Sequence, residues 1–172
     1  MTLRSVAREI GIAAPSIYAH FADREAIVEA VVDEAFEDLL GRVTRHSQDA
    51  ADPVEGLVAG CLDYARFALD EPGPYRILFG RVRPPGAPVE GPPRRLAAFT
   101  VLVDALAACV AAGRSASTDP FADAAEIWSA LHGAAALRLG ASAFPWPPIE
   151  HSVRLLVYRI GLIIQEPTDS GR

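Results

Sequence analysis

Apolar side chains recur every three or four residues along much of the chain, which is the period of an amphipathic helix. The pattern is clearest at 27–43, behind Asp23 as an N-cap, in a helix expected to end at Gly41 or one turn later. It returns at 96–112. No segment keeps the two-residue alternation of a strand bounded by hairpin turns. The sequence therefore predicts an all-α protein.

Proline, glycine and aspartate mark the ends of further helices. Asp52-Pro53-Val54-Glu55 has the spacing of a capping box, and Asp119-Pro120 is a second N-cap with proline at the first helical position. Gly113 and Gly140 are expected stops. Further helices are predicted at 53–69, 74–79, 120–139 and 149–164, with a proline-rich loop at 83–93.

Composition supports a packed helical protein and argues against a membrane protein. The chain has 172 residues, 51% of them apolar, with 31 alanines, which excludes an intrinsically disordered chain. The stretch 96–113 is nearly long enough to span a bilayer, but Asp104 lies at its centre and its larger apolar residues form one stripe. We expect no membrane segment, and a cytoplasmic location because no apolar leader opens the chain.

Charge and cysteine content narrow the function classes. Arginine is the only strongly basic residue, and 16 arginines against 22 acidic residues give a net charge of -6, so a general nucleic-acid binder is excluded. Cys61 and Cys109 are far apart in sequence and belong to no Cys/His cluster. The four histidines are scattered, and no phosphate loop or dinucleotide fingerprint is present. We expect no catalytic residue, metal or cofactor.

The first segment has the pattern of a helix-turn-helix. A helix beginning at Thr2 is stopped by Gly11, and Pro15 starts a second short helix that ends near His20. In this motif the second helix enters the major groove of DNA. Tyrosine, histidine and arginine side chains donate to phosphates, and small side chains approach base edges. The expected DNA-binding residues are Thr2, Arg4, Ala13, Pro15, Ser16, Tyr18, Ala19, His20 and Arg24.

Residues 2–43 carry a combination that resembles one bacterial family. Val6-Ala7, Gly11, Ser16-Ile17-Tyr18, His20-Phe21 and Arg24-Glu25-Ala26-Ile27 are similar to the TetR family of one-component repressors. The resemblance implies a DNA-binding module at 1–45, a ligand-binding and dimerisation domain at 46–172, and phosphate contacts from Tyr18, His20 and Arg24. The family usually has lysine at the place of Arg24, and its members begin with a further helix that we expect this chain to lack.

Two alternatives stay open for this segment. Tyr18 and His20, beside Phe21, can instead close a hydrophobic corner. Without the family's first helix, Val6 and Ile10 lose part of their cover, which weakens the module. The alternative function is therefore a dimeric small-molecule-binding module that does not bind DNA.

The last helix predicts a homodimer. It is apolar on nearly every face, and such a helix cannot lie at the surface of a monomer. One face is expected to pack inward and another to meet a two-fold mate, helped by small residues in 120–139 that permit close helix approach. The expected interface residues are Ala130, Ala134, Val153, Leu156, Val157, Ile160 and Ile164.

Two further segments, 75–79 and 128–133, are similar to a C-terminal domain of TetR-like regulators with a Trp/His-Gly signature. The resemblance implies a pocket for a small molecule among the middle helices. Apolar walls with a few polar tips suit an aromatic or lipophilic effector, although each of these residues can equally be plain core. The candidates are Tyr64, Phe67, Phe79, Phe99, Val103, Trp128, Leu131 and His132. We expect a repressor that binds a palindromic operator in double-stranded DNA as a dimer and that the effector releases.

Overall fold

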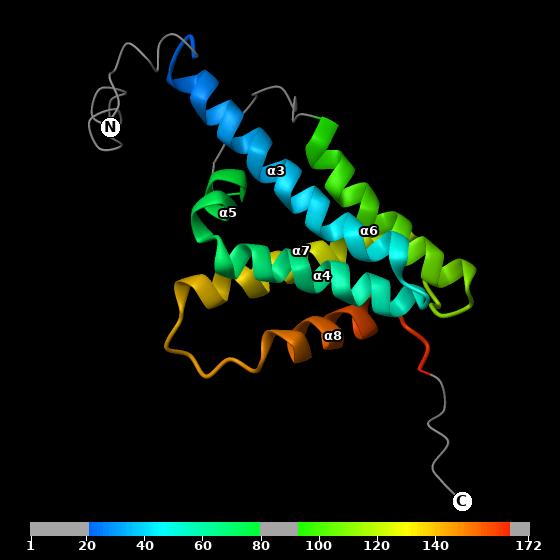
Figure 1. The fold of residues 1–172 in the computed structure, drawn as a ribbon. Helices are drawn as coiled ribbons and strands as arrows, with labels where there is room; N and C mark the ends of the chain where they lie inside the picture. Colours follow the sequence, from blue (N-terminus) through cyan, green and yellow to red (C-terminus); the bar gives the residue numbers. More distant parts are fainter. Residues whose placement is uncertain (1–20, 80–92, 166–172) are drawn as a thin grey trace, which may run out of the picture.

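The computed structural model describes residues 21–79 and 93–165, which form six α-helices and no strand. The prediction of an all-α protein is confirmed for this part of the chain. Within it, no helix is long and apolar enough to cross a membrane. The helices are α3 (Arg24–Asp49), α4 (Pro53–Asp70), α5 (Pro72–Phe79), α6 (Pro93–Ala111), α7 (Pro120–Gly140) and α8 (Ile149–Ile160), as Figure 1 shows.

Helix α4 lies at the centre of the bundle and contacts each of the other five helices. In Figure 1, α3 and α6 lie side by side above α4, α8 runs below it, and α7 lies behind it. Helix α4 can hold this position because it is buried on several faces, with Val54, Leu57 and Phe67 at 2% exposure or less and small alanines between them. Burial of these side chains is the main stabilising contribution to the fold.

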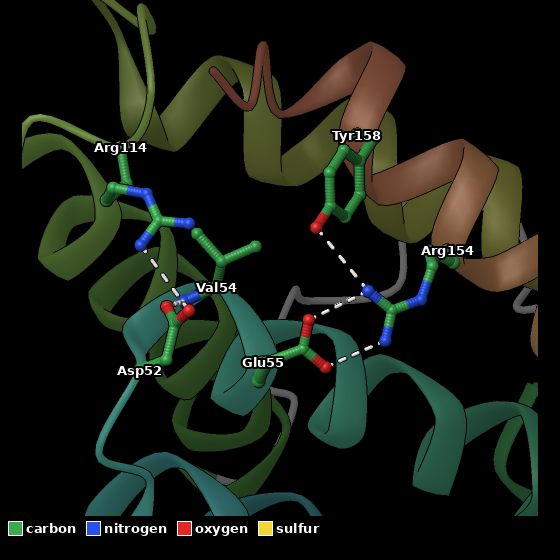
Figure 2. Close-up of polar contacts among 6 residues, drawn as sticks. All are labelled: Asp52, Val54, Glu55, Arg114, Arg154 and Tyr158. Carbon is green, nitrogen blue, oxygen red and sulfur yellow. Dashed lines mark hydrogen bonds and ion pairs between the residues drawn. The ribbon is translucent and has the colours of Figure 1, made fainter. Parts of the chain in front are cut away.

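Three predicted N-caps are confirmed. The side chain of Asp23 accepts a hydrogen bond from the Ala26 amide at 2.9 Å, and Asp119 accepts one from the Ala122 amide at 3.1 Å. Asp52 accepts from the Val54 amide at 2.9 Å. The full capping box predicted here is wrong, however, because the carboxylate of Glu55 does not turn back to the cap and instead binds Arg154 (Figure 2).

Helix α3 runs through Gly41 and ends at Asp49, so the predicted end at Gly41 or one turn later is wrong. A glycine inside a helix costs about 1 kcal/mol relative to alanine. Arg42, the next residue, makes one contact within its own helix and two contacts to distant segments. It forms ion pairs with Asp38 in α3 and with Glu71 beyond α4, and its guanidinium lies 5.5 Å from the ring centre of Phe67.

Helix α8 ends at Ile160, four residues before its predicted end. The hydroxyl of Ser115 donates to the Gly161 carbonyl at 2.7 Å, and Leu162 has a positive φ of 49° that turns the chain back. The Ile164 amide then donates to the Arg114 carbonyl, so that the chain forms a single antiparallel bridge, Ser115 to Ile163. We call residues 161–164 with 114–116 the C-terminal hook. The remaining helices agree with prediction to within three residues at each end.

Candidate functional site

An apolar cavity of about 180 Å³ lies among α3, α4, α5, α6 and α7. An apolar cavity of roughly 150 Å³ in an engineered protein stays dry and binds benzene, so this volume suits a single ring or a small fused ring. The cavity is lined by Phe36, Leu39, Val43, Gly56, Leu57, Gly60, Cys61, Tyr64, Leu78, Phe79, Ala98, Phe99, Val101, Leu102, Ala105, Trp128 and Leu131.

Small residues on two helices explain why this volume is not filled. Gly56 and Gly60 lie one turn apart on α4, and Ala98 and Ala105 line the opposite wall on α6. Gly60 also sets the approach of α3, because a Cβ there would lie 3.3 Å from the Val43 carbonyl oxygen. The helices are therefore in contact at their backbones while their side chains leave space between them.

Phe79, at the end of α5, joins the aromatic side chains around the cavity. Its ring centre lies between 5.1 and 6.3 Å from five other rings, in edge-to-face or tilted arrangements that aromatic pairs favour. Phe99 extends this group of aromatic rings. Its ring centre lies 5.9 Å from that of Trp128 and 5.2 Å from that of Phe121. The five rings around Phe79 are those of Phe36, Tyr64, Tyr75, Trp128 and His132.

A polar group of three side chains lies beside the cavity. The Nδ1 atom of His132 is 2.7 Å from the Tyr75 hydroxyl oxygen and 3.2 Å from that of Tyr64. Burial lowers the pKa of His132 and raises the pKa of both tyrosines. All three side chains are therefore uncharged at neutral pH. Of the three, only Tyr64 lines the cavity.

No lining residue among the described parts of the chain carries a charge. The only thiol in the wall is that of Cys61, and burial raises its pKa to about 12, so it stays protonated and is a poor nucleophile. The wall therefore offers apolar contact, aromatic faces and the hydroxyl of Tyr64, and it offers no group for acid–base or nucleophilic chemistry at neutral pH.

Five of the eight predicted ligand-binding residues line the cavity, namely Tyr64, Phe79, Phe99, Trp128 and Leu131. Three do not. Phe67 is fully buried beneath the Arg42 guanidinium and is a core residue. Val103 packs against the core from α6 without reaching the cavity, and His132 lies behind Tyr64. That the five bind a ligand stays a prediction.

Sequence reasoning missed the whole contribution of α3, which is Phe36, Leu39 and Val43. Their apolar spacing was evident, but a spacing alone does not tell a filled interface from a cavity wall. A signal was nevertheless present on α4. Gly56, Gly60 and Tyr64 lie four residues apart and so share one helix face, and two glycines beside an aromatic polar residue indicate a wall with space in front of it.

The predicted DNA-binding residues from Thr2 to His20 lie outside the described residues. Arg24 is the first residue of α3, and its side chain lies outside the described part too. These assignments stay predictions.

The predicted dimer residues lie at different depths within the single chain, and the interface itself stays a prediction. Arg154 and Arg159 are on the exposed side of α8, whereas Val153 and Val157 are 1% and 0% exposed. These two side chains pack inward against the chain's own core and are not available to a partner. Ala130, Ala134, Leu156 and Ile160 are half-buried, and Ile164 is exposed but lies in the hook, beyond α8. The exposed apolar side chains of α7, α8 and the hook include Leu137, Leu155 and Leu162.

Two family descriptions match this chain. Residues 57–160 match the tetracyclin repressor-like C-terminal domain, and residues 1–31 match the bacterial regulatory proteins of the tetR family. The first match alone covers more than half of the chain. The chain belongs to the TetR family. The cavity lies within the C-terminal match except for its α3 wall and Gly56, and the start of α3 lies within the N-terminal match.

Curated relatives agree with this family. HTH-type transcriptional regulators of Mycobacterium tuberculosis and Mycobacterium bovis are 28% identical over 132 residues, which cover 71% of this chain and 54% of the relative. The chain thus spans about half the length of the curated relatives it matches.

Two solved structures have the same fold. A protein of unknown function from a Rhodococcus species has a TM-score of 0.78 at 23% identity, covering 94% of this chain and 83% of the other. The TetR family transcriptional regulator PfmR from Thermus thermophilus has a TM-score of 0.72 at 19% identity, covering 94% and 87%.

Proposed function

We propose that this TetR-family chain is a transcriptional repressor that binds a palindromic operator as a homodimer, and that a small lipophilic or aromatic molecule in the cavity releases it. The relatives named above are transcriptional regulators of the helix-turn-helix type, and the N-terminal match of residues 1–31 supports the same role here. The expected contacts to DNA are those predicted from the sequence, with Tyr18, His20 and Arg24 on phosphates.

The observation that carries the proposal is the continuity of α3. This helix begins at Arg24, inside the tetR family match, and reaches Asp49 without a break. Three of its residues, Phe36, Leu39 and Val43, form one wall of the cavity. A molecule that occupies the cavity therefore contacts the helix that leads to the DNA-binding module. It changes DNA affinity by its differential affinity for the two positions of α3 and by no more than that.

A homodimer is supported by apolar side chains that a single chain leaves exposed. Leu137 on α7 is 58% exposed and Leu155 on α8 is 39% exposed. A two-fold arrangement pairs the same surface on both subunits. It would also place two recognition helices about one DNA turn apart, roughly 34–36 Å, which is the spacing that a palindromic operator requires.

Charge substitutions on this surface test the dimer. Leu137→Glu combined with Leu155→Glu should convert the protein to monomers in sedimentation velocity, because a carboxylate buried at an interface without a partner is strongly unfavourable. Leu96→Glu is the matched control, since Leu96 on α6 is 64% exposed and lies on neither α7 nor α8. A double variant that sediments as wild type, or a wild type that is already monomeric, would reject the proposed interface.

A mobility-shift assay with duplex DNA from the region upstream of the gene tests the operator. The wild-type dimer should shift this duplex, and the monomeric double variant should bind it at least tenfold more weakly because two linked modules gain from effective concentration. A wild-type protein that is dimeric and binds neither this duplex nor unrelated DNA would favour the alternative of a ligand-binding module without DNA binding.

A further inference from the structure

We infer that the cavity accepts an uncharged ring-sized molecule that carries one hydrogen-bond acceptor, such as a ketone or lactone carbonyl, and that the hydroxyl of Tyr64 donates to this acceptor. The inference rests on the proposed function, in which the cavity is the effector site, and it adds the chemical class of the effector and the residue that selects it.

The described wall offers no partner to a charged ligand. No Asp, Glu, Arg or His side chain of the described residues lines the cavity, and the chain contains no lysine. A carboxylate or ammonium group placed there would lose its hydration and gain no opposite charge, which costs far more than the apolar contacts of a small ring return. A molecule with a free acid, a phosphate or an amine is therefore expected to stay out.

The volume and the rings select the shape of the ligand. A cavity of about 180 Å³ holds one ring or two fused rings, by comparison with the roughly 150 Å³ cavity that holds benzene. Phe79, Phe99 and Trp128 present aromatic faces and edges to this space. Flat ligands pack well against such walls, since aromatic pairs gain from offset and edge-to-face contact.

The hydroxyls of Tyr64 and Tyr75 both lie near the Nδ1 atom of His132, and the hydroxyl of Tyr64 is left with a hydrogen to donate. Each nitrogen of a neutral imidazole makes one in-plane hydrogen bond, through its lone pair or through its N–H according to the tautomer. The Tyr75 hydroxyl lies 2.7 Å from Nδ1, whereas the Tyr64 hydroxyl lies 3.2 Å from the same atom. In either tautomer the shorter contact takes this one bond, and Tyr64 keeps only a long second contact. Its hydroxyl can turn toward an acceptor in the cavity at little loss.

The Tyr64 hydroxyl keeps its proton at neutral pH. Burial raises the pKa of Tyr64, and the neighbouring Tyr75 raises it further. A protonated phenol can donate a hydrogen bond. The ligand group that fits is consequently an uncharged acceptor.

Three bicyclic probes of matched shape test this inference: indane, 1-indanone and indane-2-carboxylate. Binding is followed by the fluorescence of Trp128, which lines the cavity, in a Trp146→Phe background that removes the only other tryptophan. One added hydrogen bond should make 1-indanone bind about tenfold more tightly than indane. The carboxylate should not bind at concentrations that saturate the ketone.

Tyr64→Phe should remove the preference for 1-indanone and leave the affinity for indane unchanged. Tyr158→Phe, a hydroxyl removed from α8 beside Arg154 and away from the cavity, should keep the full preference. Equal affinity for the two neutral probes, or a preference that survives Tyr64→Phe, would overturn the role of Tyr64 while leaving the cavity a ligand site. Failure of both neutral probes to bind the wild-type cavity would overturn the proposed function as well.

Discussion

The two sides of α4 differ in how they are built. Toward α3 and α6, the helix presents Gly56, Gly60 and Tyr64 to a cavity. Toward α8, it presents charged residues that form ion pairs, Glu55 with Arg154 at 2.7 Å and Arg66 with Glu150 at 3.1 Å. Helix α4 is therefore held to α8 by ion pairs on one side and borders an incompletely filled space on the other. The difference shows that the fold does not need the cavity side to be tightly packed.

The tight side is also the side that the C-terminal hook closes. Ile127, Val153 and Val157 are at 1% exposure or less in the core near α8. Gly161 is required there because a Cβ would lie 2.7 Å from the Val157 carbonyl oxygen. Figure 2 shows Arg154 holding both carboxylate oxygens of Glu55 while Arg114 reaches Asp52 at the start of α4.

The largest expected effect comes from removing a side chain on the tight side. Ile127→Ala should lower the free energy of unfolding by about 2–5 kcal/mol, since a fully buried aliphatic side chain is lost and a cavity is left behind. Leu102→Ala, in the cavity wall and only half-buried, should cost clearly less. Urea denaturation of both variants measures the difference, and equal losses would mean that the two sides are packed alike.

Enlarging a side chain should destabilise the closely packed side of α4 and leave the cavity side as stable as before or more stable. Ala135→Leu, at a fully buried position of α7, should destabilise the protein by about 1–3 kcal/mol through overpacking. Ala105→Leu adds the same atoms to a cavity wall and should leave stability unchanged or higher while abolishing indane binding. Thermal unfolding and the probe titration give the two readouts, and a destabilised Ala105→Leu that still binds indane would refute the position of the empty volume.

A smaller effect is expected from pH at the aromatic cluster. Burial holds the pKa of His132 below its ordinary value of 6.5, so the unfolded chain binds a proton more readily than the folded chain does. Stability should therefore fall as the pH drops below about 6.5. His132→Gln should flatten this dependence between pH 7 and pH 5.5 in urea denaturation curves, relative to His151→Gln at an exposed position of α8. An unaltered slope would show that His132 is not held neutral.

The smallest effect is expected at the Glu55–Arg154 pair, whose side chains are about half exposed. Its coupling in a double-mutant cycle should be below about 1 kcal/mol. The bound guanidinium lowers the pKa of Glu55, so the contribution is present above pH 4.5 and is lost as the pH falls through the lowered pKa. A coupling well above this range would mean that the pair, and not the apolar core, fixes α8 on α4.

Local signals were sufficient for much of the fold. Asp23, Asp52 and Asp119 were identified as N-caps because a short acceptor side chain acts within its own turn. The errors lie where distant residues decide. Helix α3 continues past Gly41, where Arg42 contacts the distant Glu71, and α8 stops early, where the distant Ser115 binds the Gly161 carbonyl.

The candidate site was only partly predictable for the same reason. The sequence pointed to Tyr64, Phe79 and Trp128 through a family resemblance, but the α3 wall comes from a helix whose apolar face looked like ordinary core. Val153 and Leu155 are both apolar on one helix, yet only Val153 faces the core. Which side of an apolar helix faces inward depends on its packing against α4 and α7, which spacing along the chain does not specify.

A crystal of the chain under xenon pressure tests the difference between the two sides of α4 most directly, because xenon enters dry apolar cavities and leaves close-packed cores unoccupied. We predict a xenon peak between α4 and α6, bounded by Leu57, Phe99 and Trp128, and no peak around Ile127 and Val153. The absence of xenon from the first position, or its presence at the second, would contradict the existence of an open ligand space on one side of α4 alone.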